Sequence, residues 1–195
     1  MHDTVSLAAG VVSAALVLVA FLVYNRDDSK INTGTWLILA LGDSFDFWSY
    51  FQMTDENWLK NAVPIAFAGG SVITFGIALA RRRFSWPDPH DWVIIGLDIL
   101  ITIWWRVSSD NAAANLLYQA TAILAFLPMY RGLIEGKERE TFLPWILWTA
   151  AFGTFFVTAV MHMTQWQELV YPIVGTLTHG LVIGFVLRAR GVRRT

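Results

Sequence analysis

The chain has 195 residues and a formal net charge of -1, and 55% of its residues are hydrophobic whereas only 15% are charged. This number of charged side chains is too small to give a protein of this size the polar surface of a soluble globule. The composition therefore predicts an integral membrane protein. The absence of cysteine excludes disulfide bonds, thiolate metal sites and a cysteine nucleophile.

Seven apolar segments are expected to cross the membrane as helices, since about 20 residues in a helix span the hydrocarbon core. They cover about 5–24, 35–53, 62–80, 92–107, 112–133, 141–163 and 171–187. Only short loops remain, so residues 1–195 are predicted to form a single transmembrane domain. We expect the third segment to begin near Pro64, and Asp91, which follows a Trp-Pro-Asp-Pro run, to cap the fourth.

Basic residues alternate between the two sides of this predicted bundle. Loops one, three and five and the C-terminal tail hold 12 of the 14 lysines and arginines. Because short cytoplasmic loops retain Lys and Arg, the N-terminus is predicted outside and the C-terminus in the cytoplasm. Residues 188–195 then form a basic cytoplasmic tail that contacts anionic lipid rather than nucleic acid.

The two halves of the chain also resemble each other. Three regions match in the same order: 20–26 with 125–131, 36–39 with 145–148, and 64–82 with 172–190, at offsets of 105, 109 and 108. Chance similarity among apolar helices is the alternative. The matches predict two parallel triple-helix repeats, 5–80 and 112–187, with 92–107 as a linker helix in a 3+1+3 arrangement.

One short motif makes this arrangement more specific. Phe126-Leu127-Pro128 closes the first helix of the second triplet, and we expect the helix to be broken at Pro128, before a basic loop. Together with the 3+1+3 arrangement, this resembles the SWEET and PQ-loop superfamily, which shares its architecture with nicotinamide riboside type vitamin transporters and the KDEL receptor. The resemblance covers nearly the whole chain. It implies a central pocket reached alternately from either side, with Pro128 and Pro144 as hinges.

Two acidic residues lie inside the second apolar segment. Asp43 and Asp46 are three residues apart and share one helix face. Each costs about 2.5 to 3.5 kcal/mol at mid-bilayer, so the pair should face a wet cavity or a partner. A proton or cation site, or contact with a polar substrate, is the functional interpretation. A structural pair bonded to neighbouring helices, or a shallower position in the membrane, is the alternative.

Other polar or aromatic residues could line the same pocket. Trp48 follows the acids and could stack on substrate, as tryptophan at about this place does in the sugar carriers that the chain resembles, or simply pack. Asn115 and Gln119 share a face four residues apart and could bind substrate opposite the acids or bond neighbouring helices. Thr178 and His179 lie in the middle of the last segment, where a histidine could relay protons or serve as a packing residue.

The predicted function is transport of a small polar or aromatic solute, sugar-like or vitamin-like, by alternating access. The rival is a non-transporting receptor or an assembly subunit of a larger membrane complex with the same fold. We expect no enzyme, metal or cofactor, since no phosphate loop, paired-histidine zinc pattern or nucleophile elbow occurs. The expected partners are the lipid bilayer and a small-molecule solute, with no nucleic acid; homo-oligomerisation and a larger complex stay open.

Overall fold

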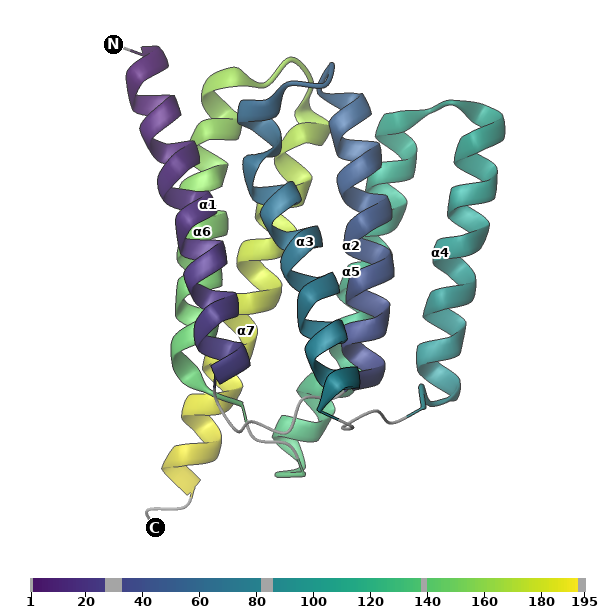
Figure 1. The fold of residues 1–195 in the computed structure, drawn as a ribbon, viewed down its shortest axis with the longest axis vertical. Coiled ribbons are helices and arrows are strands. Elements are labelled where there is room, and N and C mark those ends of the chain that lie inside the picture. Colours follow the sequence, from purple (N-terminus) through teal and green to yellow (C-terminus); the bar gives the residue numbers. More distant parts are fainter. Residues whose placement is uncertain (1, 27–32, 82–85, 138–139, 193–195) are drawn as a thin grey trace.

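A computed structural model describes residues 2–26, 33–81, 86–137 and 140–192. In these ranges the chain forms seven α-helices that lie side by side, with the two termini at opposite ends of the bundle (Figure 1). We call these the N-terminal end and the C-terminal end. The elements are α1 (His2–Arg26), α2 (Thr33–Met53), α3 (Trp58–Ala80), α4 (Pro89–Ser108), α5 (Asn111–Ile134), α6 (Phe142–His162), the 3-10 helix η1 (Trp166–Leu169) and α7 (Val170–Val192).

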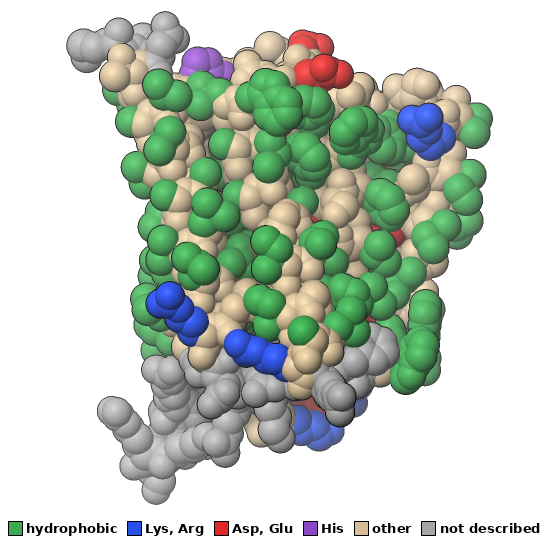
Figure 2. All heavy atoms as spheres, in the orientation of Figure 1, with side chains coloured by type: hydrophobic (Ala, Val, Ile, Leu, Met, Phe, Trp, Pro, Cys, Tyr) green, Lys and Arg blue, Asp and Glu red, His purple; other side chains and the backbone are tan. Residues whose placement is uncertain are grey.

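Five helical stretches are long and apolar enough to cross a membrane: those of α1, α3, α5 and α6, and Trp166–Arg188, which contains η1 and most of α7. α2 and α4 have similar lengths, 21 and 20 residues, but carry acidic residues in their interiors. Hydrophobic side chains cover the flank of the bundle between its ends (Figure 2). The chain is therefore an integral membrane protein.

The predicted helix ends were wrong at two places. α3 begins at Trp58, six residues before Pro64, because the Asn57 side chain accepts hydrogen bonds from the backbone of residues 59 and 60. α4 begins at Pro89 with Asp88 as its N-cap, and Asp91 completes the capping box from the third helical position.

The prediction that the helix breaks at Pro128 was also wrong, because α5 runs through this residue to Ile134. Proline lacks the N–H that would bond the carbonyl four residues earlier, at Leu124. His90 of α4 places its Nε2 3.4 Å from that carbonyl oxygen, so a neighbouring helix takes the place of the missing donor. Pro144 lies in the first turn of α6, where a missing N–H leaves no bond unmade.

The helices pack in a regular order. α3 lies against both α1 and α2, and α7 lies against both α5 and α6. α1 packs along α6, and α2 packs along α5. α4 packs on α5 and α2 and stands at the edge of the bundle (Figure 1).

The interior between these helices is mainly aromatic. Phe21, Phe67, Trp148 and Phe152 belong to one buried cluster that draws on α1, α3 and α6. Close helix packing depends on glycine here: a Cβ at Gly70 of α3 would overlap the Phe21 ring, and a Cβ at Gly175 of α7 would overlap the Phe152 ring.

Candidate functional site

Acidic side chains from two helices meet halfway along the bundle. Asp43 lies ten residues from each end of α2, and Asp98 lies nine and ten residues from the ends of α4. Both line a small cavity between α2, α4 and α5, together with Asp46 and Tyr118. The cavity measures about 10 Å³, which is room for about one water molecule.

Asp46 is fully hydrogen-bonded by amides of α5. Its side chain is buried, with Oδ1 accepting from Asn115 Nδ2 at 2.6 Å and Oδ2 accepting from Gln119 Nε2. Ser49, one turn on, donates to the Asp46 backbone carbonyl at 2.9 Å. The structure therefore brings together Asp46, Asn115 and Gln119. The helical spacings had predicted that the acids share one face of their helix and that the two amides share one face of theirs.

Asp43 has a different partner. Its Oδ2 accepts a hydrogen bond of 2.5 Å from Ser71 Oγ of α3. Whereas Asp46 is buried, Asp43 is partly exposed, so it lies where the cavity approaches the outside of the bundle. The two acids of α2 thus connect this helix to α5 and to α3.

Asp98 was not assigned to the site from the sequence. Its side chain is 1% exposed, and neither carboxylate oxygen has a hydrogen-bond partner among the described residues. A Cβ added at Gly42 would lie 3.2 Å from Asp98 Oδ2, so glycine at this position lets the carboxylate approach α2. A lone acid in the middle of an apolar helix is the sequence signal that identifies such a residue.

Thr178 and His179 lie in another environment. His179 is buried among aromatic rings, with ring centroids 5.1 Å from Phe152 and 5.2 Å from Phe67, and its Nδ1 lies 2.8 Å from the Gly175 carbonyl oxygen. The Thr178 hydroxyl donates to Val174 O at 2.8 Å. Neither residue lines the cavity between the acids.

Trp48 also lies apart from the acids. Its side chain is 48% exposed and contacts the rings of Phe47 and Phe51 on the outer face of α2. Two residues along a helix rotate the side chain by about 200°, so Trp48 and Asp46 point in nearly opposite directions. Sequence proximity to the acids therefore did not place Trp48 in the same cavity.

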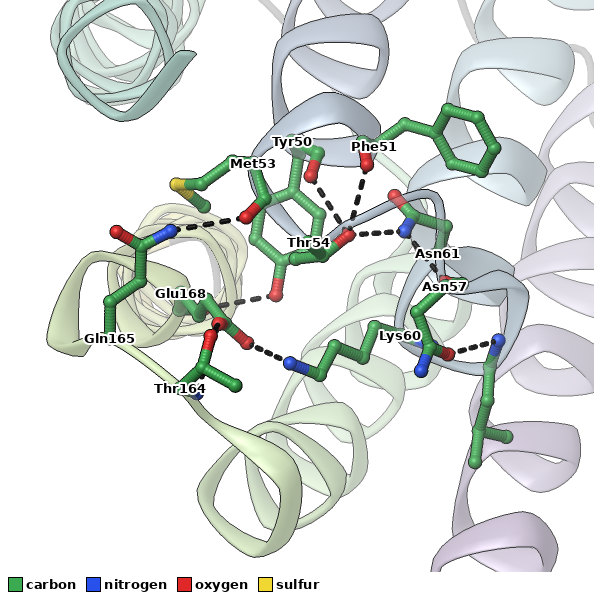
Figure 3. Close-up of polar contacts among 11 residues, drawn as sticks. Tyr50, Phe51, Met53, Thr54, Asn57, Lys60, Asn61, Thr164, Gln165 and Glu168 are labelled. Carbon is green, nitrogen blue, oxygen red and sulfur yellow. Dashed lines mark hydrogen bonds and ion pairs between the residues drawn. The ribbon is translucent and has the colours of Figure 1, made fainter. Parts of the chain in front are cut away.

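A second polar cluster lies at the N-terminal end and was not predicted from the sequence. Lys60 Nζ of α3 lies 2.7 Å from Glu168 Oε2 of η1, and the two side chains are 7% and 0% exposed. The other oxygen of Glu168 accepts from the backbone N–H of Thr164 at 3.0 Å and from its hydroxyl at 2.7 Å. Figure 3 shows this ion pair between the ends of helices that are far apart in sequence.

Two further hydrogen bonds join α2 to η1 and to the residue before it. Tyr50 OH donates to the Glu168 carbonyl at 3.1 Å, and Gln165 Nε2 donates to the Met53 carbonyl at 3.1 Å (Figure 3). The sequence placed Lys60 and Glu168 in separate loops. The signal that could have linked them is their separation of 108 residues, the same offset that relates the third and seventh apolar segments.

The predicted hinge residue Pro128 borders a wider cleft of about 430 Å³ at the C-terminal end, together with His90 and charged side chains of α5 and the loop after it. Within this cleft Arg131 Nε lies 2.7 Å from Glu135 Oε1, and Lys137 Nζ lies 2.5 Å from Glu135 Oε2. The hydrogen bond from Arg131, followed by that from Lys137, lowers the pKa of Glu135 to about 2. Glu135 therefore stays ionised and paired at neutral pH.

The arrangement thus combines a buried acid-and-amide cluster at mid-bundle, an aromatic interior and a buried ion pair at the N-terminal end. No known protein family, curated protein or solved structure matches this chain.

Proposed function

We propose that this protein is a small-solute membrane transporter with a SWEET-like 3+1+3 arrangement. Two parallel three-helix units, α1 to α3 and α5 to α7, rock against each other, and α4 links them. The helix contacts carry the proposal. In each unit the third helix packs against the first and the second, and the first helix of each unit packs along the second helix of the other. This reciprocal packing is expected of two units related by a two-fold axis along the membrane normal.

The ion pair at the N-terminal end supports the same symmetry. Lys60 and Glu168 stand at equivalent positions, before or at the start of the third helix of each unit, and they meet each other. A contact between equivalent residues is expected where a two-fold axis passes. Their pairing joins the units and closes this end.

A polar contact between α1 and the residue before α6 also joins the units at the C-terminal end. Glu140, just before α6, accepts from Tyr24 OH of α1 at 3.3 Å and from Trp145 Nε1 at 3.1 Å. Hydrogen bonds and ion pairs can break and re-form without loss of helix structure. A transporter that opens to one side at a time needs such separable closures at both ends.

The proposed solute position lies between the units. The bonds from Asn115 and Gln119 to Asp46 cross from α5 to α2, and so from one unit to the other. The adjoining aromatic rings offer flat faces for stacking. A small polar or aromatic solute would exchange hydrogen bonds with the amide-and-acid cluster and pack against these rings.

We further propose that the N-terminal end faces the outside. Among the described basic residues, Arg26, Arg81, Arg131, Lys137 and Arg188 belong to the C-terminal ends of their helices or to the loop beside them, all at the C-terminal end of the bundle. The positive-inside rule then puts this end in the cytoplasm.

Uptake into proteoliposomes tests the proposal with a panel of labelled sugars, nucleosides and vitamins. We expect uptake of at least one compound, and its loss in Asp46→Asn, since the substituted amide cannot accept both α5 donors. Asp55→Asn, in the exposed loop between α2 and α3, is the matched control and should retain uptake. Equal uptake by both variants would remove the acid from the mechanism.

The rival function, a receptor or assembly subunit, predicts a different result. Purification from native membranes would then yield a stable partner in fixed stoichiometry, and no compound of the panel would be taken up. That pair of outcomes would overturn the transport proposal.

A further inference from the structure

The cavity at mid-bundle holds a buried carboxyl group without a counter-charge. Asp46 has two amide donors and Asp43 has one hydroxyl donor. The buried Asp98 carboxylate makes no hydrogen bond of standard geometry with a described residue: the Thr121 hydroxyl lines the same cavity but donates to the Tyr118 carbonyl at 3.0 Å. A carboxylate withdrawn from water without donors or a counter-charge is strongly disfavoured. Asp98 therefore needs a ligand that supplies positive charge.

The groups around Asp98 do not supply that charge. The ionisable groups that face it are Asp43 and Asp46 from α2 and the Tyr118 phenol from α5, and in the described part of the chain no Lys, Arg or His lines the cavity. The phenol is already engaged with Thr102 Oγ1 at 2.7 Å. Arg106, two turns further along α4, has an exposed side chain.

We propose that Asp98 is the proton-binding site of this transporter and that its proton is coupled to solute movement; the coupling rests on the proposed function, whereas proton binding does not. A proton suits the cavity better than a metal ion does. The space fits about one water molecule, and among the described residues no three His, Cys, Asp or Glu side chains are placed to hold a metal. One proton neutralises Asp98 and leaves room for a bridging water.

The proton step is simple to balance. A hydronium ion reaching the cavity transfers a proton to one Oδ of Asp98, so that an O–H bond forms on the carboxyl group and a neutral water remains. Release on the other side reverses the step. Gly42 keeps the space between α2 and Asp98 free of side-chain atoms.

The position of the site explains how protonation could be coupled to transport. α4 contacts α2 of one unit and α5 of the other, so Asp98 lies at the junction of the linker helix with both. Loss of the proton would place a negative charge beside the carboxyl groups of Asp43 and Asp46. Repulsion between α2 and α4 would then favour a conformation in which the cavity opens to water.

Infrared difference spectroscopy of the purified protein tests proton binding without any solute. The native protein should show the carbonyl stretch of a buried protonated carboxyl group, which disappears as pH rises. Asp98→Asn should lose this band, and Asp55→Asn should keep it. An unchanged band in Asp98→Asn would overturn the assignment.

A second variant guards against misfolding of the first. Gly42→Ala adds a methyl group 3.2 Å from Asp98 Oδ2, so it should shift the band while the carboxyl group remains. A band at the same frequency in Gly42→Ala and in the native protein would contradict the assignment of the proton to Asp98. Loss of the band on adding sodium chloride, but not choline chloride, at constant pH would show a sodium site instead.

Coupling is tested separately in proteoliposomes that contain a trapped pH dye. A solute that the protein takes up should acidify the lumen in the native protein and lose this effect in Asp98→Asn. Solute uptake with no proton movement in the native protein would overturn the coupling and leave transport intact. A normal infrared band with no uptake of any solute would overturn transport and leave the proton site intact.

Discussion

The buried ion pair between Lys60 and Glu168 provides the sharpest test of the packing. Lys60→Met removes the ammonium group, and Glu168→Gln removes the carboxylate charge but keeps an oxygen for the two Thr164 donors. Each single change leaves the other group buried and unpaired. The double variant leaves neither charge behind.

The expected magnitudes follow from burial. Breaking one partner of a buried pair costs about 3 to 5 kcal/mol, whereas replacing both with uncharged groups is often nearly neutral. Since the side chains are 7% and 0% exposed, we expect each single variant to lose about 3 kcal/mol and the double variant about 1 kcal/mol. For a protein of this length, a loss of 3 kcal/mol lowers Tm by about 10 °C.

The assay is unfolding of the purified protein in detergent micelles, followed by the fluorescence of its ten tryptophans. Glu135→Gln is the control, because Arg131 and Glu135 are also 2.7 Å apart but 80% and 32% exposed. An exposed pair contributes little, so this variant should leave Tm unchanged. Additive effects of Lys60→Met and Glu168→Gln, within about 0.5 kcal/mol, would refute the coupling between the two units at this end.

Three further predictions test local features of the structure. Gly70→Ala should lower the free energy of unfolding by about 1 to 3 kcal/mol through overpacking, whereas Gly69→Ala, which has nothing within 4 Å, should be tolerated; equal effects would contradict the close helix approach. Asn57→Ala removes the α3 cap and should cost about 1 kcal/mol in the same unfolding assay, and an unchanged curve would argue against a helix start at Trp58. In this cysteine-free chain, Asp55→Cys should react with a membrane-impermeant thiol reagent in intact cells and Lys137→Cys only after the cells are opened; the reverse would invert the proposed orientation.

Several features of the site could be predicted because they are local. The spacing of Asp43 and Asp46, and of Asn115 and Gln119, fixes a shared face on each helix whatever the neighbours are. The cost of acids in hydrocarbon then requires partners for them. From these two facts the meeting of Asp46 with the α5 amides could be anticipated, although their distances could not.

Other features depended on which helix faces meet. Trp48 was grouped with the acids because it is near them in sequence, yet it points outward. In a membrane protein the outward face and the packed face are both apolar, so the hydrophobic pattern does not distinguish them. The same ambiguity left Asp98 outside the predicted site.

By itself, the sequence determined that this is a membrane protein of seven helices with acids in the middle of α2 and α4, because hydropathy and helical periodicity are properties of short segments. Only the tertiary structure decided that α2, α4 and α5 enclose a cavity with an unpaired Asp98, and that Lys60 and Glu168 pair across 108 residues. These contacts join segments that are distant in the chain. The energy that selects them comes from packing and desolvation between helices, and these depend on which helices are neighbours rather than on the sequence of any one segment.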